Sequence, residues 1–504
     1  MRAEIAPARA EPPLILAVDI GTSSVRALVF DRLGRSVTQL KTHLPYQMRT
    51  TADGGVEIEA ENILRLVASV IDRTLHRARR RRGEIRAVAF STFWHSLLGV
   101  GTDGRPVTPL LSWADTRSRH AADTLRRALD ERAVHLRTGC RFHPSYLPAK
   151  LLWLSKTQPA RFRQSARWVS IGEYLYRRFF GHATVGTSVA SATGLLDLGN
   201  CVWDKEVLAA LPVQAEQLSP IDDTPARGLS KVFARRWPSL QEVPWFPAAG
   251  DGTCSNIGSG CLSPEREALS VGTSGALRIV WEGGPLEIPP GLWCYRVDRR
   301  RLAMGGALSN AGNLYAWLRR ALRAGGEATV ERALARMDPD RHGLTLLPFL
   351  SGERSPGWIA EARGVVAGLT LSTAPLHLLR AGLEAVAYRF LAIDTILRQA
   401  FPQAREVVAS GKGLLSSPAW MQIMADVLGR PVIASREPEA SSRGAALLAL
   451  EALGLIRLTE VRTSFGRRYH PRGAATERYR EAFRRQTKLY DLFAPWWEGA
   501  QAPP

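Results

Sequence analysis

Residues 14–30 read LILAVDIGTSSVRALVF, and the expected fold follows from this segment. The continuous apolar run 14–20 predicts a buried strand, and its single carboxylate, Asp19, stands near the end of that strand. The polar turn Gly21-Thr22-Ser23-Ser24 interrupts the run, and residues 25–30 predict a second strand. One structural unit therefore consists of a strand, a glycine-containing polar turn and another strand.

The same unit returns about 250 residues further along the chain. Residues 268–271 predict a short apolar strand, Gly272-Thr273-Ser274-Gly275 forms the turn, and residues 276–281 predict the next strand. In both places further strand segments and a helix follow. A repeat this long indicates two duplicated domains rather than a solenoid array. We therefore expect an α/β fold with mixed sheets and helices packed on them.

The boundary between the two domains is expected near residues 255–265, where glycines and a proline interrupt any regular element. The expected parts are a loose N-terminal arm at 1–13, an N-terminal domain at 14–258, a C-terminal domain at 259–454 and a C-terminal extension at 455–504. The arm is charged, contains prolines and lacks the apolar core of a secretory signal. The extension has no assigned role, and its last four residues are expected to fray.

Each Gly-Thr-Ser turn has the chemistry of a phosphate-binding loop. Glycine lets the backbone approach a ligand closely, and successive N–H groups and hydroxyls can then hold phosphate oxygens. One such turn alone is more often a plain hairpin turn, but two copies in matching contexts favour a triphosphate held between the domains. Asp19 would reach a magnesium ion directly or through water. The expected phosphate-binding residues are Gly21, Thr22, Ser23, Gly272 and Thr273.

Asp251 stands between two glycines at the end of a predicted strand. Open backbone around an exposed carboxylate suits a general base that takes a proton from a substrate hydroxyl. The alternative interpretation is a surface Asp-Gly turn. A second small-residue segment, Gly411-Lys412-Gly413, follows another predicted strand. An adenine ring can lie on such a backbone, and the alternative there is a plain strand–helix loop.

Polar and aromatic residues that follow strands of the first half are candidates for contact with a small substrate. Trp113 can stack on a carbon skeleton, while Asp115 and Arg117 can bind hydroxyls or a carboxylate. Trp94 and His95 come at the end of another predicted strand. The alternatives are a structural histidine at position 95 and a surface ion pair between Asp115 and Arg117.

The composition is that of a soluble globular protein, with 45% hydrophobic and 23% charged residues and no apolar stretch long enough for a transmembrane helix. The formal net charge is +20, but the basic residues are spread along the chain without a recognition motif, so nucleic-acid binding is not expected. The charge favours anionic ligands such as ATP. Five cysteines without a C-x-x-C pair indicate buried free thiols in a reducing cytoplasm.

These segments together resemble the FGGY family of carbohydrate kinases, over about residues 14–450. The matching segments are Asp19-Ile-Gly-Thr-Ser-Ser24, Asp251-Gly252, Gly272-Thr-Ser-Gly275, Gly352-Glu-Arg-Ser-Pro356, Arg363-Gly364 with Gly368-Leu-Thr370, and Ser410-Gly-Lys-Gly413 to Ala425-Asp426. The resemblance implies an actin-like (ribonuclease H-like) duplicated fold with an ATP and substrate cleft between the domains. It also implies phosphoryl transfer from magnesium-ATP to a sugar hydroxyl, with Asp251 as the catalytic base.

The resemblance further implies roles for some of the matching segments. Residues 21–23 and 272–273 would form the two phosphate loops, and Asp19 and Asp251 would lie near the magnesium ion. The family usually shows adjacent glycines in its adenosine motif, whereas Lys412 separates the two glycines here. The residues that would contact the adenosine are Gly411, Lys412, Gly413 and Ser416.

The substrate-side segments are most similar to the gluconate-kinase subgroup of the family. They are His95-Ser96, Trp113-Ala-Asp-Thr-Arg117, His143-Pro-Ser-Tyr-Leu-Pro-Ala-Lys150 and Ser191-Ala-Thr-Gly-Leu-Leu-Asp197. This similarity implies that D-gluconate is phosphorylated on its terminal hydroxyl. A carboxylate substrate needs a cation, and among Arg117, Lys150 and His143 the guanidinium is favoured because it pairs in a bidentate manner. The implied substrate-binding residues are Trp94, His95, Asp115, Arg117, Asp251 and Gly252.

Two alternatives stay open. The same chemistry could serve another polyol, as in a xylulokinase-like or other pentulose kinase. A non-catalytic, nucleotide-binding regulatory protein is the second alternative, because a fold does not fix a function; the presence of both Asp19 and Asp251 argues against it. The expected partners are ATP, magnesium and a small sugar or sugar acid, with no nucleic acid and no membrane. The oligomeric state stays open, with a homodimer as one option.

Overall fold

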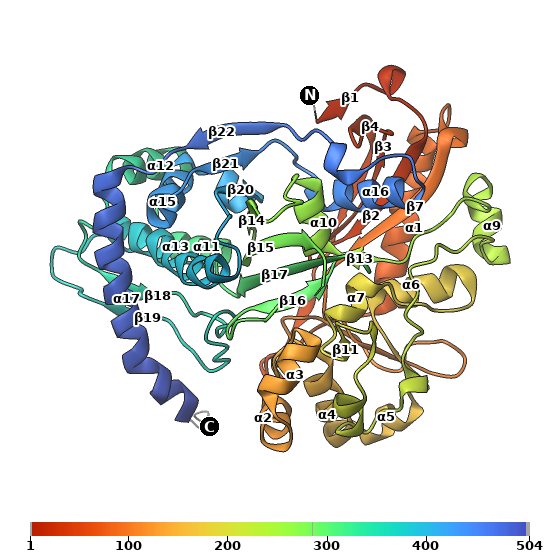
Figure 1. The fold of residues 1–504 in the computed structure, drawn as a ribbon, viewed down its shortest axis with the longest axis horizontal. Helices are drawn as coiled ribbons and strands as arrows, with labels where there is room; N and C mark the ends of the chain where they lie inside the picture. The colour runs from red at the N-terminus through yellow and green to blue at the C-terminus, as the bar shows by residue number, and fades with distance from the viewer. Residues whose placement is uncertain (1–2, 285, 500–504) are drawn as a thin grey trace.

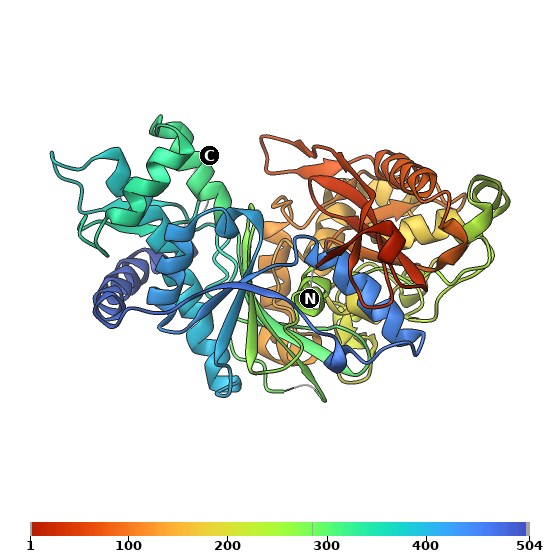
Figure 2. The ribbon, with the colours of Figure 1, turned by 90° about the horizontal axis from the view of Figure 1, so that it is seen from above.

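The computed structural model describes residues 3–284 and 286–499, which form two lobes, each built on one mixed sheet (Figures 1 and 2). The first sheet contains, in spatial order, β1 (Glu4–Ile5), β4 (Ser36–Pro45), β3 (Ser24–Phe30), β2 (Leu14–Ile20), β7 (Ile85–Thr92) and β13 (Ala249–Gly250). The second contains β16 (Trp293–Arg296), β17 (Arg301–Leu308), β15 (Gly275–Glu282), β14 (Arg266–Val271), β20 (Glu406–Ser410), β21 (Val432–Ser435) and β22 (Phe465–Tyr469).

Five strands of each sheet share one order and one set of directions. In the first sheet β3 runs antiparallel to β2 and β4, while β7 and β13 continue parallel to β2. In the second sheet β15 runs antiparallel to β14 and β17, while β20 and β21 continue parallel to β14. The two Gly-Thr-Ser turns join β2 to β3 and β14 to β15, so they occupy the same place in each sheet. The predicted duplicated α/β fold is confirmed.

The remaining elements cover the sheets or form smaller units beside them. In the first half, α1 (Ala60–Arg77) packs its apolar face on β3 and β4. The other strands and α-helices of that half are β5 (Arg49–Thr50), β6 (Val56–Ile58), β8 (Leu98–Val100), β9 (Leu110–Leu111), β10 (Arg167–Val169), β11 (Leu196–Asp197), β12 (Val202–Trp203), α2 (Arg119–Ala128), α3 (Glu131–Thr138), α4 (Leu147–Thr157), α5 (Pro159–Gln164), α6 (Ile171–Phe180), α7 (Thr187–Ser191), α8 (Lys205–Ala209) and α9 (Lys231–Arg236).

In the second half, the long helix α13 (Pro375–Ala400) packs on β15 and β17. Beside it lie the helices and strands α11 (Gly312–Ala321), α12 (Glu327–Arg336), β18 (Thr345–Leu347), β19 (Val365–Ala367), α14 (Lys412–Leu415), α15 (Pro418–Leu428) and α17 (Gly473–Gly499). Helix α13 therefore packs on one face of the second sheet, as α1 packs on one face of the first.

Two helices cross between the lobes and pack against each other. Helix α10 (Asp251–Gly258) continues from the first sheet but contacts β15 of the second. Helix α16 (Ala440–Ala452) follows the second sheet but packs on β2 and β7 of the first. A Cβ atom at Gly258 would lie 1.9 Å from the carbonyl oxygen of Ala440, and one at Gly444 would lie 1.8 Å from that of Cys254. The two backbones are therefore in direct contact, which only glycine permits at these positions.

The N-terminal arm is fastened to the first lobe, which corrects the expectation that it lies loose. Strand β1 pairs in parallel with β4, with Glu4 opposite Ser36. The guanidinium of Arg81 donates hydrogen bonds to the carbonyl oxygens of Pro7 and Ala10. Strand β1 has only two residues, which is too short to show an alternation of apolar and polar side chains. The prolines and charges of the segment therefore resembled a frayed end.

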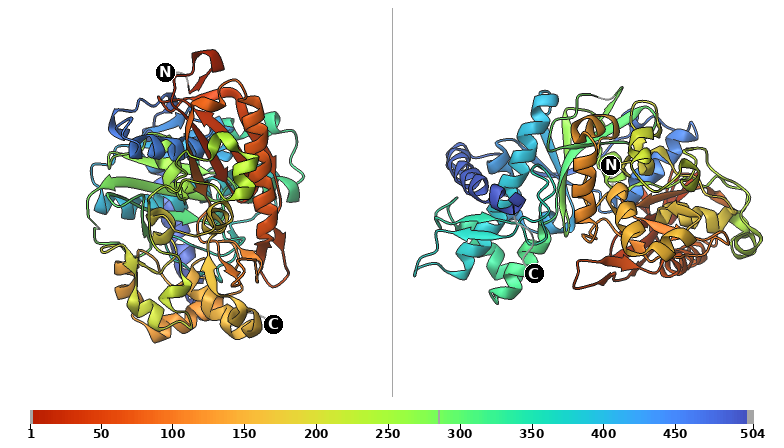
Figure 3. Two further views of the ribbon diagram at one scale, coloured as in Figure 1. Left: turned by 90° about the vertical axis from the view of Figure 1, so that its right-hand side faces the viewer. Right: turned by 90° about the horizontal axis from the view of Figure 1, so that it is seen from below.

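The segment after residue 454 belongs to the second lobe rather than forming a separate extension. Strand β22 pairs antiparallel with β21 and becomes the last strand of the second sheet. Helix α17 then packs on α15 and β18, along the outer side of that lobe (Figure 3). The last four residues, which the sequence predicts to fray, lie outside the described residues.

All five cysteines are buried and unpaired, which confirms the expected free thiols. None of the helices within the described ranges has the length and apolar character needed to cross a bilayer.

Replacing Gly444 by alanine would place a methyl group against the Cys254 carbonyl, so α10 and α16 would have to separate. We expect the free energy of unfolding to fall by about 1–3 kcal/mol, the usual effect of overpacking a tight contact. Thermal and denaturant unfolding measure this change. Gly473→Ala, at the start of α17 where no atom lies within 4 Å of the added Cβ, is the control that leaves stability unchanged or slightly raised. Equal transitions for the wild type and Gly444→Ala would contradict the close contact.

Candidate active site

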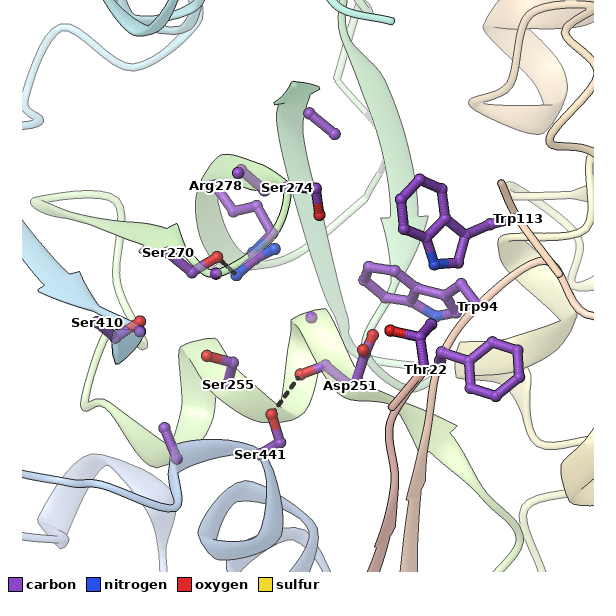
Figure 4. Close-up of a pocket in the computed structure, with 18 of the residues that line it drawn as sticks. Thr22, Trp94, Trp113, Asp251, Ser255, Ser270, Ser274, Arg278, Ser410 and Ser441 are labelled. Atoms are coloured by element: carbon purple, nitrogen blue, oxygen red, sulfur yellow. Dashed lines mark hydrogen bonds between the residues drawn. The ribbon is translucent and has the colours of Figure 1, made fainter. Parts of the chain in front are cut away.

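A cavity of about 320 Å³ lies between the two lobes and receives side chains from both halves of the chain. In Figure 4, Trp94 and Trp113 lie on one side of it, Arg278, Ser270 and Ser410 lie on the other, and Asp251 lies between them. The cavity is lined by residues singled out in the sequence, among them Asp19, Thr22, Trp94, His95, Trp113, Asp251, Gly252, Gly272 and Gly411. Residues more than 300 positions apart in the sequence thus meet in one cleft.

The two Gly-Thr-Ser turns both reach this cleft, but their backbones close differently. The Gly21 amide donates to the carbonyl three residues on, that of Ser24, at 3.0 Å, whereas the Gly272 amide donates to the carbonyl two residues on, that of Ser274, at 2.9 Å. Thr22 and Gly272 line the cleft. Their neighbours in the turns, Ser23 and Thr273, are solvent-exposed beside it, and Gly21 is half-buried. The exposed amides and hydroxyls of two facing turns form a cradle suited to an oxyanion such as a polyphosphate.

Asp251 opens helix α10 directly after β13, rather than standing in a surface turn. The indole of Trp94 lies over the glycines on either side of it: a Cβ at Gly250 would be 1.7 Å from Nε1, and one at Gly252 would be 2.4 Å from Cζ3. Both flanking residues must therefore be glycine. The Ser441 hydroxyl donates to the Asp251 carbonyl at 3.2 Å (Figure 4), which ties the start of α10 to α16.

Burial raises the pKa of Asp251 to about 7, and the charge of Asp19 adds to the rise while Arg278 opposes it. A carboxyl group with this pKa is poised to accept a proton near neutral pH. The pKa of Asp19 is also raised, mainly by burial, and Arg26 opposes that shift. Asp19 is 7% exposed, and its Oδ1 atom is buried without a hydrogen-bond partner.

The two aspartates fit a divalent cation. Both carboxylates line one cleft, each disfavours the charge of the other, and one oxygen of Asp19 is unsatisfied. Magnesium prefers such oxygen ligands and keeps several waters of its own. A cation between Asp19 and Asp251 would relieve the repulsion between them and satisfy that oxygen.

His95 is held as a neutral imidazole with one ring nitrogen bonded to the backbone. Its Nδ1 donates to the carbonyl oxygen of Ala192 at 2.6 Å, since a carbonyl can only accept. Burial lowers the pKa of His95 to about 3, so the ring is uncharged at neutral pH. Its Nε2 is then an acceptor, the group that receives a hydrogen bond from a hydroxyl. The backbone adopts φ = 62° at this residue, a conformation rare for histidine.

Aromatic rings form the walls around His95. Its ring lies 4.9 Å from that of Tyr146, and Tyr295 stacks on Trp293 at 4.2 Å. The hydroxyls of Tyr146 and Tyr295 are hydrogen-bonded to each other at 2.6 Å. Such surfaces pack against the C–H faces of a carbohydrate while hydroxyls and ring nitrogens bind its oxygens.

Asp115 and Arg117 do not line this cleft, contrary to the sequence-based expectation. The Arg117 guanidinium pairs at 2.6 Å with the carboxylate of Asp115 and at 2.6 Å with that of Glu57. It also lies over the ring of Trp153 at 4.8 Å. Asp115 is 1% exposed, so the group is an internal ion-pair network and not a surface pair. Sequence spacing could not reveal this pair, because Glu57 belongs to a separate strand that only the fold brings to the Arg117 guanidinium.

The two other cations considered for a substrate carboxylate are also engaged elsewhere. The ammonium of Lys150 donates to the carbonyl oxygens of His95 and Ser112, both at 2.7 Å. His143 accepts a hydrogen bond from the Ser145 amide and packs its ring against Trp358. Lys150 therefore supports the backbone of His95 rather than a ligand.

Three arginines that the sequence reasoning missed line the cleft: Arg26, which pairs with Glu439, and Arg278 and Arg354, which form no ion pair with the described residues. Arg354 lies over Trp113 at 4.7 Å and donates from Nη2 to the carbonyl of Leu308, while its Nε is buried without a partner. Arg278, on β15, donates to Asn256 and Ser270. One feature of the sequence could have pointed to Arg278, because it is a charged residue within an otherwise apolar strand directly after the second turn. Arg354 lay in a segment already noted for its resemblance, but without an assigned role.

The adenosine segment is only partly in the cleft. Gly411 lines the cleft, while Lys412 is exposed at the start of α14 and Ser416 is exposed at its end. A Cβ at Gly413 would lie 3.0 Å from the carbonyl oxygen of Val271, so this residue packs on the end of β14. Lys412, which separates the two glycines, therefore does not fill the cavity.

Two family models match most of the chain: the N-terminal domain of the FGGY family of carbohydrate kinases over residues 14–258, and the C-terminal domain over 268–453. The chain belongs to the FGGY family of carbohydrate kinases. A carbohydrate kinase of this family uses ATP, which agrees with the two polar turns that the sequence predicts to hold phosphate. The fold and family that the sequence predicts are thereby confirmed.

Individual relatives carry three different names. A gluconokinase of Bacillus subtilis is 28% identical over 460 residues, covering 88% of each chain. A glycerol kinase of Allorhizobium ampelinum is 31% identical over 462 residues, covering 88% of this chain and 90% of the other. The solved structure of a ligand-bound xylulose kinase from Lactobacillus acidophilus has a TM-score of 0.88 and 27% identity, covering 95% and 98%. Overall similarity thus supports a sugar kinase without fixing the sugar.

Arg117→Ala should destabilise the fold and leave substrate binding intact. Removing the guanidinium leaves the buried carboxylate of Asp115 with backbone N–H donors but no ion pair, while Glu57 keeps its pair with Arg49. Breaking a buried pair in this way lowers the free energy of unfolding by about 3–5 kcal/mol. Arg105→Ala, at a side chain that is 85% exposed, is the matched control with no effect. Denaturant unfolding and the KM for sugar are measured on folded protein. Unchanged stability with a raised KM would return Arg117 to the substrate site.

Proposed function

We propose that this kinase transfers the γ-phosphoryl group of ATP to the terminal hydroxyl of D-gluconate, forming 6-phosphogluconate, with Asp251 as the general base. The choice of a sugar acid as substrate rests on the position of Arg354. Its guanidinium lies at the aromatic end of the cleft, and no carboxylate of the described residues lies within 4 Å of it. A cation in that position favours an anionic substrate group over a neutral one.

The phosphate end of the site uses the two turns. The amides and hydroxyls of residues 21–23 and 272–273 bind the phosphate oxygens, and Gly411 with its neighbours Lys412, Gly413 and Ser416 borders the adenosine. Asp19 and Asp251 would hold magnesium, which supplies positive charge to the phosphates when bound. The charge of the triphosphate is thus balanced from both lobes.

The substrate end orients the sugar for attack. His95 accepts a hydrogen bond from a substrate hydroxyl through Nε2, and Trp94 packs beside Asp251 and Gly252 to limit the position of the reacting carbon. Asp251 accepts the proton of the terminal hydroxyl as its oxygen attacks phosphorus. Arg354 pairs with the carboxylate at the other end of the molecule. Closure of the cleft excludes water, which limits hydrolysis of ATP.

A xylulokinase-like activity is the second candidate. His95 and the aromatic walls suit the hydroxyls and C–H faces of any small polyol, and the relative with a TM-score of 0.88 is named a xylulose kinase. A purely regulatory role has less support, because both aspartates line the cleft beside the two phosphate-binding turns. The two enzyme candidates differ in whether an anionic group on the substrate is required.

Asp251→Asn should lower kcat by about 10²- to 10⁴-fold, the usual contribution of general-base catalysis, while the protein still folds and binds ATP. In the wild type, kcat/KM for the sugar should rise with pH and then level off, with the inflection at or below about 7 because magnesium beside the same carboxylate would lower its pKa. The direction follows from burial, which raises the pKa of Asp251 to about 7 so that the carboxylate, the basic form, is lost as the pH falls. A coupled assay for ADP measures both. Normal turnover by the Asn variant, or a flat profile from pH 5 to 8, would remove Asp251 as the base.

Arg354→Gln should lower kcat/KM for gluconate by about 10- to 100-fold, since hydrogen bonds to charged groups contribute about 1.5–3 kcal/mol. The panel contains gluconate, xylulose, ribulose and glycerol, and the neutral sugars should lose far less. Arg363→Gln, at an exposed arginine of the same segment, is the control. A wild type that prefers a neutral sugar would overturn gluconate as the substrate. Equal losses on all four compounds would show that Arg354 binds no carboxylate.

A further inference from the structure

Arg278 lies on an inner strand of the second sheet. It comes three residues after the start of β15, the strand that follows the second Gly-Thr-Ser turn. It lies on β15 opposite Ala268 of β14 and Gly305 of β17, and only 5% of the residue is exposed. Its side chain lines the cleft together with Asp251, Gly272 and Ser274. Figure 4 shows it on the side of the cleft opposite the tryptophans. Its position is therefore between the candidate base and the candidate phosphate loop.

Two neutral side chains fix the orientation of the guanidinium. Nε donates to Oδ1 of Asn256 at 2.9 Å, and Nη2 donates to the Ser270 hydroxyl at 2.9 Å. Asn256 belongs to α10, the helix that begins with Asp251, and Ser270 belongs to β14, the strand that leads into Gly272. Among the described residues, Nη1 has no hydrogen-bond partner. A Cβ at Gly252 would lie 3.2 Å from Nη1, so this nitrogen is directed toward the Asp251–Gly252 peptide.

No carboxylate within residues 3–284 and 286–499 lies within 4 Å of this guanidinium. Three other buried arginines of the second lobe, Arg380, Arg389 and Arg430, each form ion pairs with carboxylates, and Arg296, which forms none with the described residues, donates to backbone carbonyls instead. Burial lowers the pKa of Arg278 to about 10, with Asp251 opposing the shift, so it remains charged at neutral pH. An unpaired buried cation is costly for folding alone. Its retention in the cleft indicates an anionic partner that arrives with the ligand.

We propose that Arg278 binds the phosphoryl group during transfer and is a catalytic residue of this kinase. In the reaction, a bond forms between the sugar oxygen and γ-phosphorus, and the bond from γ-phosphorus to the bridging oxygen breaks. The electron pair of that bond leaves on the β-phosphate of ADP, and the proton of the sugar hydroxyl passes to Asp251. Negative charge on the three outer oxygens must be stabilised during this step. A fixed guanidinium on the side of Gly272 supplies that stabilisation.

This role rests on phosphoryl transfer beside Asp251, as proposed above, but not on the identity of the sugar. A structural role, in which Arg278 only joins α10 to β14, is the competing explanation. The two explanations differ in the kinetic constants. A residue that acts in the transition state changes kcat and leaves the KM values nearly unchanged, whereas a structural residue lowers stability and changes binding.

The test uses the full chain and the panel sugar that turns over best. Arg278→Lys and Arg278→Gln should lower kcat by about 10²- to 10³-fold, near the range of a lost oxyanion contact. The KM values for ATP and sugar should change less than about fivefold, because binding before transfer does not depend on this contact. ADP should still bind, but ADP with aluminium fluoride and sugar, which mimics the group in transfer, should bind much more weakly. Guanidinium ion should partly restore turnover of Arg278→Ala.

Arg296→Lys is the matched control, a buried arginine of the same sheet whose guanidinium donates only to the backbone carbonyls of Leu198 and Arg299. It should keep a normal kcat. Asn256→Ala removes one support of Arg278 but not its charge, and should give an intermediate loss of kcat even where the Arg278 variants fold poorly. A kcat within threefold of wild type for folded Arg278→Gln, or a loss found only in the KM for ATP, would overturn the proposal. Normal turnover by Asp251→Asn would instead overturn the proposed base.

Discussion

The direct backbone contact between α10 and α16 is the constraint on which the rest of the structure depends. Each helix leaves one sheet and packs on the other, and glycines at 258 and 444 let them touch. The start of α10 is Asp251, and the hydroxyl of Ser441 holds that start from α16. The candidate base is therefore placed by the same contact that joins the lobes. A change in the angle between the lobes would move the carboxylate relative to the phosphate turns.

Charge is distributed along the cleft in a defined order. The carboxylates of Asp19 and Asp251 line it without ion pairs to any described residue, as do the guanidiniums of Arg278 and Arg354, while Arg26 pairs with Glu439 at its border. Arg278 donates to Ser270 on the strand that leads into the second turn, while Arg354 lies over the ring of Trp113. Because none of these groups has a full set of partners within the protein, each has bonding capacity for a ligand. The arrangement would separate the proposed phosphate region from the proposed sugar region within about 320 Å³.

The sequence predicted the features that depend on local pattern. Both Gly-Thr-Ser turns and the duplicated strand order could be recognised because a buried strand, a tight turn and another strand are contiguous in the chain. Arg117 was wrongly expected in the cleft, since Glu57 lies 60 positions away and only the fold brings it to the guanidinium. Arg278 and Arg354 were missed because only the fold shows that they lack a carboxylate partner among the described residues. Their surroundings come from four separate segments, so no local pattern marked them as unpaired.

The aromatic walls come from parts of the chain that contribute nothing to the phosphate turns. Trp113 follows β9, Tyr146 precedes α4, Trp293 and Tyr295 lie on β16 at the edge of the second sheet, and Trp358 lies in the segment before β19. Peripheral loops and an edge strand accept substitution more readily than central strands do. The fold can therefore exchange one sugar for another over evolutionary time, or in a designed library at these five positions, while its nucleotide chemistry remains constant.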